Sequence, residues 1–179
     1  MSSLDLISFG TVAYCPMFMS GAQVIRPYVT PSNAKSSPTL YKFYSSYGYH
    51  FGVDLVHYSN SAQFTKFDVY APCMGLVLEI SLAYVDNQTD KYSVVVQYDA
   101  TTTFRLSGLS NVFVSVGSSV LQADKIGACD RWLHFEMLSA NQSEKSSPSY
   151  IFNKLRVYPV NPHTYFSGNY SGLSDDFGE

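Results

Sequence analysis

The chain has 179 residues, a formal net charge of −3 at pH 7 and 14% charged residues. This length suits one domain with a full hydrophobic core and is short for two. The charge distribution has no basic surface typical of nucleic-acid binding and no polybasic run typical of anionic membranes. No apolar stretch approaches the roughly 20 residues of a membrane span, and no secretory signal is recognisable.

The composition favours β-structure. Aromatic residues make up 16% of the chain, with 15 Tyr and 12 Phe, and aromatic and β-branched side chains suit pleated, half-buried surfaces. The three cysteines are an odd number without a CxxC pair. Neither a disulfide framework nor a thiolate zinc site is therefore indicated.

Three regions differ in character along the chain. In residues 1–39, short apolar pieces alternate with prolines that interrupt regular elements, so we expect an irregular N-terminal arm with an attachment role. Residues 40–166 carry the strand-like patterns of one domain. Residues 167–179 are small, polar and acidic, which predicts a disordered tail.

Short β-branched and aromatic runs separated by turn signals fill the middle region. This pattern predicts an all-β fold, an antiparallel sandwich or barrel-like sheet. The expected strands are residues 67–72 continuing as 76–82, 92–98, 101–106, 112–117 and 132–138, with 150–157 as a last strand or a helical turn.

Three residues suggest a metal site. His50 and Asp54 lie four residues apart, and His134 stands in the alternating pattern of residues 132–138. Two imidazoles and one carboxylate are ligands that a catalytic zinc ion takes from a protein, with the fourth position left for water. The alternative is that these are unrelated, half-buried histidines.

A series of motifs follows in unbroken order over residues 40–140. The motifs are His50-Phe51-Gly52-Val53-Asp54, Asp68-Val69-Tyr70-Ala71-Pro72, Ser107-Gly108-Leu109-Ser110, Val114-Ser115-Val116-Gly117, Ile126-Gly127 and Leu133-His134-Phe135-Glu136. In this order the sequence resembles the lysostaphin/LytM family of zinc peptidoglycan endopeptidases. The resemblance implies the fold of that family and assigns His50, Asp54 and His134 as ligands of one zinc ion.

The chain departs from the family at both catalytic histidines. Their positions are occupied by Gly108 and Trp132, and neither side chain exchanges a proton with water near neutral pH. The loop before His134 is also several residues shorter than the family usually has. His57 is a candidate substitute base, with an exposed loop histidine as the alternative.

Three further residues near the motifs are candidates for supporting roles. Glu136 shares a strand face with His134, so it is a possible second-shell partner or a cross-strand partner of a surface lysine. Arg131 is a candidate donor to an oxyanion or a carboxylate, or a solvated charge at a strand end. A turn that folded Cys129 inward would instead close the fourth zinc position with a thiolate.

The resemblance and its departures lead to three hypotheses. The favoured one is a catalytically impaired or silent binding or structural module of a phage tail or a cell-wall-associated assembly. Its partners would be a peptidoglycan peptide or, through the arm, other virion or cell-wall proteins, which places the chain in a phage virion or in the extracellular cell wall. The alternative is an active zinc endopeptidase that cleaves peptidoglycan cross-bridges with a substitute base. The third is a β-rich assembly protein with coincidental histidines.

Overall fold

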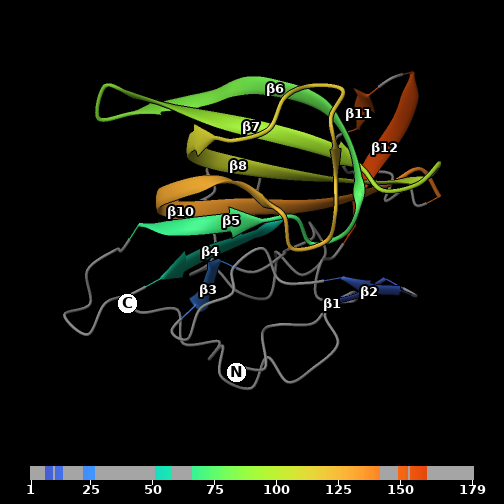
Figure 1. Cartoon of the computed structure of the whole chain (residues 1–179), viewed down its shortest axis with the longest axis horizontal. Coiled ribbons are helices and arrows are strands. Elements are labelled where there is room, and N and C mark those ends of the chain that lie inside the picture. Colours follow the sequence, from blue (N-terminus) through green and yellow to red (C-terminus); the bar gives the residue numbers. More distant parts are fainter. Residues whose placement is uncertain are drawn as a thin grey trace, which may run out of the picture.

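The structure is a computed structural model that describes residues 7–9, 11–13, 22–26, 51–57, 66–141, 149–152 and 154–160, with His57 and the first three segments described by backbone only. In this part of the chain every regular element is a strand (Figure 1). The prediction of an all-β fold is confirmed. None of the described residues forms a helix that could cross a membrane.

The strands fall into a small sheet and a large one. Strands β1 (Ile7–Phe9) and β2 (Thr11–Ala13) pair with each other. The large antiparallel sheet has the order β11-β12-β10-β8-β7-β6-β9, with β4 and β5 also on β10 and β3 on β4. Its strands are β3 (Ala22–Arg26), β4 (Val53–His57), β5 (Phe67–Tyr70), β6 (Gly75–Asp86), β7 (Thr89–Gln97), β8 (Thr102–Val112), β9 (Ser119–Val120), β10 (Lys125–Ser139), β11 (Tyr150–Phe152) and β12 (Leu155–Val160).

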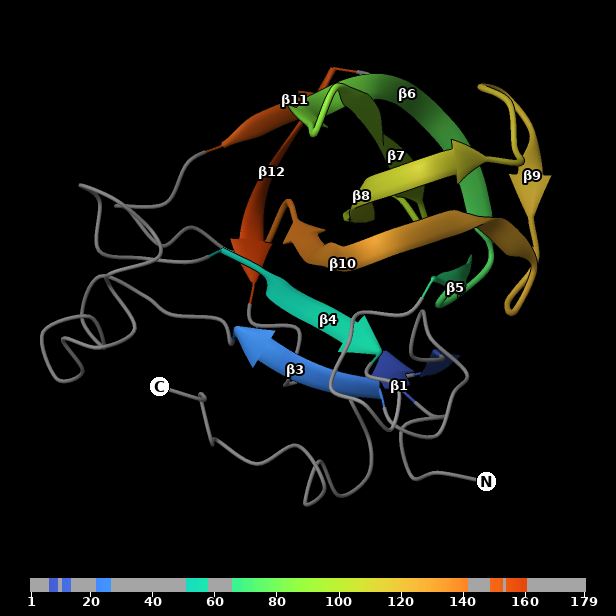
Figure 2. The ribbon, with the colours of Figure 1, turned by 90° about the vertical axis from the view of Figure 1, so that its left-hand side faces the viewer.

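Strand β10 is the spine of the large sheet. Along one edge it pairs with β8, from Gly127 to Ser139. Along its other edge it pairs in succession with β5, β4 and β12. Figure 2 shows how this arrangement makes the sheet curl around its interior.

The hydrophobic core occupies both faces of the sheet. Val94 and Val96 of β7 are fully buried in the larger cluster, inside the curl. The intervening Val95 is buried on the opposite face with Leu138, Phe152 and Val157. Side chains alternate between the faces of a strand, so the β11–β12 hairpin supplies the cover for the second face.

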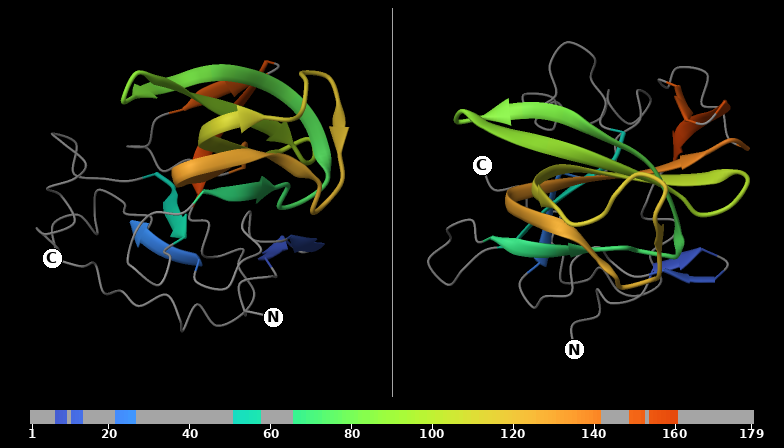
Figure 3. Two further views of the ribbon diagram at one scale, coloured as in Figure 1. Left: turned by 60° about the vertical axis from the view of Figure 1, so that its left-hand side comes forward. Right: turned by 45° about the horizontal axis from the view of Figure 1, so that its top comes forward.

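The β6–β7 hairpin extends beyond the neighbouring strand β8 at its turn (Figure 3). Its loop is Asn87-Gln88, between the register partners Asp86 and Thr89. Both loop residues have positive φ, 47° and 62°. Two-residue loops of this kind match the twist of the flanking strands, so the turn carries Asp86 and Lys91 toward β10.

Several predicted elements differ in extent from the observed ones. Residues 125–139 form one strand where only residues 132–138 were expected, because the chain passes through a bulge without leaving the sheet. Residues 113–118 form a loop instead of a strand, since Gly117 (φ 86°) sits in a turn closed by the Ser118 amide and the Ser115 carbonyl. Residues 150–157 lie in the β11–β12 hairpin.

Candidate metal centre

Asp54 and His134 face each other across two paired strands. They are direct register partners of β4 and β10, and Oδ1 of Asp54 lies 2.7 Å from Nδ1 of His134. Asp54 is only 2% exposed. The sheet therefore brings together two residues that are 80 positions apart in the sequence.

Glu136 holds the other side of the imidazole. It lies two residues beyond His134 on β10, and its Oε1 is 3.3 Å from Nε2 of His134. Its second oxygen accepts a hydrogen bond from Nε of Arg105, the register partner on β8. Both ring nitrogens of His134 thus have a carboxylate partner.

This arrangement sets the charges of the centre. Burial by itself lowers the pKa of His134, but hydrogen bonds and charges from Asp54 and Glu136 outweigh it and raise the pKa to about 10. Burial raises the pKa of Glu136, and the neighbouring His134 and Arg105 more than offset this effect, so the pKa lies below its ordinary value. The metal-free centre is a protonated imidazole between two carboxylates.

Gly52 supplies a close backbone contact behind the imidazole. A β-carbon at this position would lie 2.7 Å from Cε1 of His134 and 2.8 Å from the carbonyl oxygen of Phe135. Such distances leave no room for a side chain. The glycine of the His-x-Gly-x-Asp motif therefore lets the chain pass directly against the ring.

Two of the three predicted zinc ligands lie side by side. A carboxylate oxygen and an imidazole nitrogen converge, and the remaining imidazole nitrogen has a carboxylate partner, as is usual for zinc-bound histidine. The third predicted ligand, His50, lies outside the described residues. Within the described ranges no group of three or more His, Cys, Asp or Glu is arranged to hold a metal. A bound zinc would supply Lewis acidity and lower the pKa of a coordinated water.

Gly108 is one of the two residues that the resemblance placed at a catalytic histidine position. Its φ is 100°, and a β-carbon there would lie 2.6 Å from the carbonyl oxygen of Trp132. The cause is a bulge: Leu109 pairs with Cys129 and Ser107 with His134, so residues 130–133 of β10 stand opposite Gly108 alone. Backbone fills the space that a side chain at position 108 would need.

Trp132, which the resemblance placed at the second such position, belongs to an aromatic and ionic cluster. Its ring stacks on Tyr84 with centroids 6.3 Å apart, and the Arg131 guanidinium lies 4.7 Å from the indole centroid. Arg131 also pairs with Asp86 at 3.1 Å. These contacts link the turn of the β6–β7 hairpin to β10.

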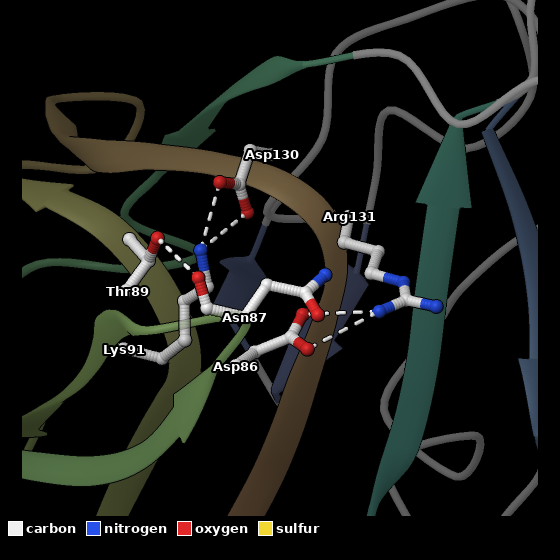
Figure 4. Close-up of a pocket in the computed structure, with 6 residues that line it drawn as sticks. All are labelled: Asp86, Asn87, Thr89, Lys91, Asp130 and Arg131. Carbon is white, nitrogen blue, oxygen red and sulfur yellow. Dashed lines mark hydrogen bonds and ion pairs between the residues drawn. The ribbon is translucent and has the colours of Figure 1, made fainter.

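A second ion pair lies in the same region. Nζ of Lys91 is 2.7 and 2.9 Å from the two oxygens of Asp130, and Lys91 is only 3% exposed. The two pairs line a cavity of about 300 Å³ together with Asn87 and Thr89 (Figure 4). The charges that line this cavity pair with one another, and the two ion pairs fasten the hairpin to β10.

The remaining predicted site residues lie as follows. Arg131 is directed to Asp86, as described above, whereas Glu136 contacts His134. The thiol of Cys129 donates to the carbonyl oxygen of Trp132 at 2.9 Å, and burial raises its pKa to about 12, so it is held as a thiol. Only the backbone of His57 is described.

Two residues that form ion pairs in this region were not predicted from the sequence. Arg105 stands between Phe104 and Leu106 in a predicted strand, and Lys91 precedes another. A charged residue flanked by apolar ones in a strand is the available signal, because such a charge is buried only with a partner. The partner's identity depends on strand register, which the sequence pattern alone does not supply.

Comparison with known proteins gives a likeness at the level of structure. No protein-family model matches the sequence, and no curated protein matches it. A chain in the crystal structure of the SpoIIIAH–SpoIIQ complex matches with a TM-score of 0.62 and 19% identity, over 86% of this chain and 99% of that one.

Two peptidase structures match as well. The solution structure of lysostaphin gives a TM-score of 0.55 at 16% identity, over 99% of this chain and 59% of that one. The catalytic domain of the prophage-encoded M23 protein EnpA from Enterococcus faecalis, in a mutant form, gives 0.54 at 17% identity, over 84% of this chain and 95% of that one. The chain therefore has the lysostaphin/M23-type fold that the resemblance implied.

Proposed function

We propose that this chain is a lysostaphin-fold module that holds one zinc ion and binds its partner without cleaving it. Its proposed ligands are Asp54, His134 and His50, the last of which lies outside the described residues. The partner is a peptidoglycan peptide or another protein of a phage tail or cell-wall-associated assembly. The zinc ion joins β4 and β10 through these ligands, and the protein acts by binding.

The conformation of Gly108 is the observation that carries this proposal. The positive φ and the 2.6 Å approach to the Trp132 carbonyl leave no room for an imidazole at this position. At the second family position, the Trp132 indole nitrogen donates hydrogen bonds and does not accept protons. Loss of a general base or an oxyanion donor costs about 10²–10⁴ in rate each, so the two losses together leave binding as the function.

Two of the similar structures support a role in an assembly. One match is to a chain of a complex of two proteins, and a second structure of those proteins is described as a pore-forming complex. EnpA, by contrast, is prophage-encoded and its M23 domain is catalytic. The fold thus occurs both in protein complexes and in enzymes.

Binding without cleavage can be tested on purified peptidoglycan. We expect the wild-type protein to sediment with insoluble peptidoglycan or with a virion fraction, and to release no soluble fragments while lysostaphin does. Asp54→Asn, which removes the charge of one ligand at nearly constant volume, should weaken sedimentation. Release of fragments by the wild type but not by Asp54→Asn would instead establish the alternative, an active endopeptidase with a substitute base.

A further inference from the structure

We infer that Arg105 and Tyr150 are positioning residues for His134, acting through Glu136. The inference rests on the proposed metal centre in so far as it concerns zinc affinity. Its structural part, the fixed orientation of the imidazole, applies to the metal-free protein as well. Neither residue belongs to the motifs that predicted the centre.

Glu136 is the link between the imidazole and Arg105. It is 3% exposed, so its carboxylate depends on protein partners in place of water. Oε1 faces Nε2 of His134 at 3.3 Å, and Oε2 accepts from Nε of Arg105. If Arg105 were uncharged, the buried carboxylate would have one cationic neighbour left and would be free to turn toward other donors.

Tyr150 fixes Arg105 from the far side. The guanidinium lies 4.3 Å from the centroid of the Tyr150 ring, a favourable cation–π geometry. The hydroxyl of Tyr150 is 3.5 Å from Oε1 of Glu136. Tyr150 in turn stacks on Phe152 with centroids 6.0 Å apart. Strand β11 thereby holds the arginine in the position that Glu136 requires.

The consequence is that each ring nitrogen of His134 has a fixed partner. With Nε2 held by Glu136, Nδ1 faces Asp54 at 2.7 Å. A half-turn of the ring about the Cβ–Cγ bond would put Cδ2 in the place of Nδ1 and Cε1 in the place of Nε2, and would break both contacts. Gly52 packs against Cε1, so backbone on one side and Glu136 on the other define a single orientation. Partners of this kind contribute about 10–100-fold to metal affinity.

The variants separate charge, geometry and stacking. Arg105→Met removes the charge at similar length, Arg105→Lys keeps the charge but loses the planar fork, and Tyr150→Leu removes the stacked ring. Arg156→Met is the matched control, because Arg156 is exposed and donates to Ser149.

Zinc affinity is measured by competition with a chelator. The ring orientation is read in the metal-free protein from the NOE between Hε1 of His134 and Hα of Gly52.

We expect Arg105→Met to weaken zinc binding by about 10–100-fold and to lose the NOE, with smaller losses of about 3–10-fold for Arg105→Lys and Tyr150→Leu. Arg156→Met should match the wild type. Unchanged affinity and an unchanged NOE in folded Arg105→Met overturn the inference. If Arg105→Met does not fold, unchanged zinc affinity and an unchanged NOE in Arg105→Lys overturn the inference. A wild type that binds no zinc removes the proposed metal function, whereas the NOE still decides the positioning role.

Discussion

The carbonyl oxygen of Trp132 lies 2.6 Å from the place that a β-carbon of residue 108 would occupy. The backbone of Trp132 thus excludes a side chain at position 108, one of the two positions that the resemblance assigns to catalytic histidines. The bulge of β10 brings the backbone of Trp132 against Gly108, and the Cys129 thiol donates to the carbonyls of both Gly108 and Trp132.

This contact predicts that Gly108→His does not restore hydrolysis. The milder Gly108→Ala should lower the free energy of unfolding by about 2–5 kcal/mol, from left-handed backbone strain and the contact with the carbonyl oxygen. Gly117→Ala is the matched control: φ is 86° and no atom lies within 4 Å of the added carbon, so only strain of about 1–2 kcal/mol applies. Chemical denaturation measures both. Equal losses in the two variants would contradict the packing argument.

Gly52→Ala should act on the imidazole directly. The added methyl group would lie 2.7 Å from Cε1 of His134, so the ring must move away from Asp54. We expect zinc affinity to fall by more than about 10-fold, with the protein still folded. Competition with a chelator gives the affinity, and circular dichroism checks the fold. An unchanged affinity would mean that the ring orientation is irrelevant to the metal.

The pH dependence of stability follows from the charges around His134. Its pKa is raised from 6.5 to about 10, so its stabilising contribution is complete below pH 6.5 and is lost as the pH rises toward 10. The pKa of Glu136 is lowered from 4.5, so its contribution is present above pH 4.5 and is lost as the pH falls. The metal-free protein should be most stable between these limits.

Denaturation in EDTA at several pH values tests this dependence. His134→Gln should flatten the decline above pH 6.5, because the titrating group is gone. An equal decline in this variant would assign the alkaline limb to other groups.

The Lys91–Asp130 pair gives a prediction for the hairpin. Asp130→Asn leaves a buried ammonium without its counter-charge, and we expect a loss of about 1–3 kcal/mol, less than for a fully buried pair because Asp130 is 41% exposed. Lys91→Met should cost under about 1 kcal/mol, and Lys91→Met in the Asp130→Asn background should recover most of the loss. Additive effects in this double-mutant cycle would contradict the pairing.

Much of the fold follows from local pattern, whereas the site depends on register. Runs of β-branched and aromatic residues bounded by turn signals predicted the strands near residues 76–82 and 92–98. Asp130 and Arg131 looked like a turn, yet they lie in the bulge of the continuous strand β10. Polar residues interrupt the apolar pattern of a strand in a bulge as well as in a turn, so the sequence does not distinguish the two.

The metal centre was predictable only in part. The resemblance singled out Asp54 and His134, and the structure places them opposite each other on β4 and β10. Arg105 was not predicted as part of this region, and the resemblance named Gly108 without its left-handed conformation. Their roles arise from pairing between β8 and β10, a contact between distant segments that no local spacing encodes.

Zinc content and fragment release, measured on the same samples, decide between binding and cleavage of peptidoglycan. Wild-type protein and His134→Ala are loaded with zinc, freed of excess metal and incubated with purified peptidoglycan. We predict one zinc per wild-type chain, little or none in the variant, and no soluble fragments from either. Fragment release by the zinc-loaded wild type that disappears in His134→Ala would contradict the account and identify a working endopeptidase.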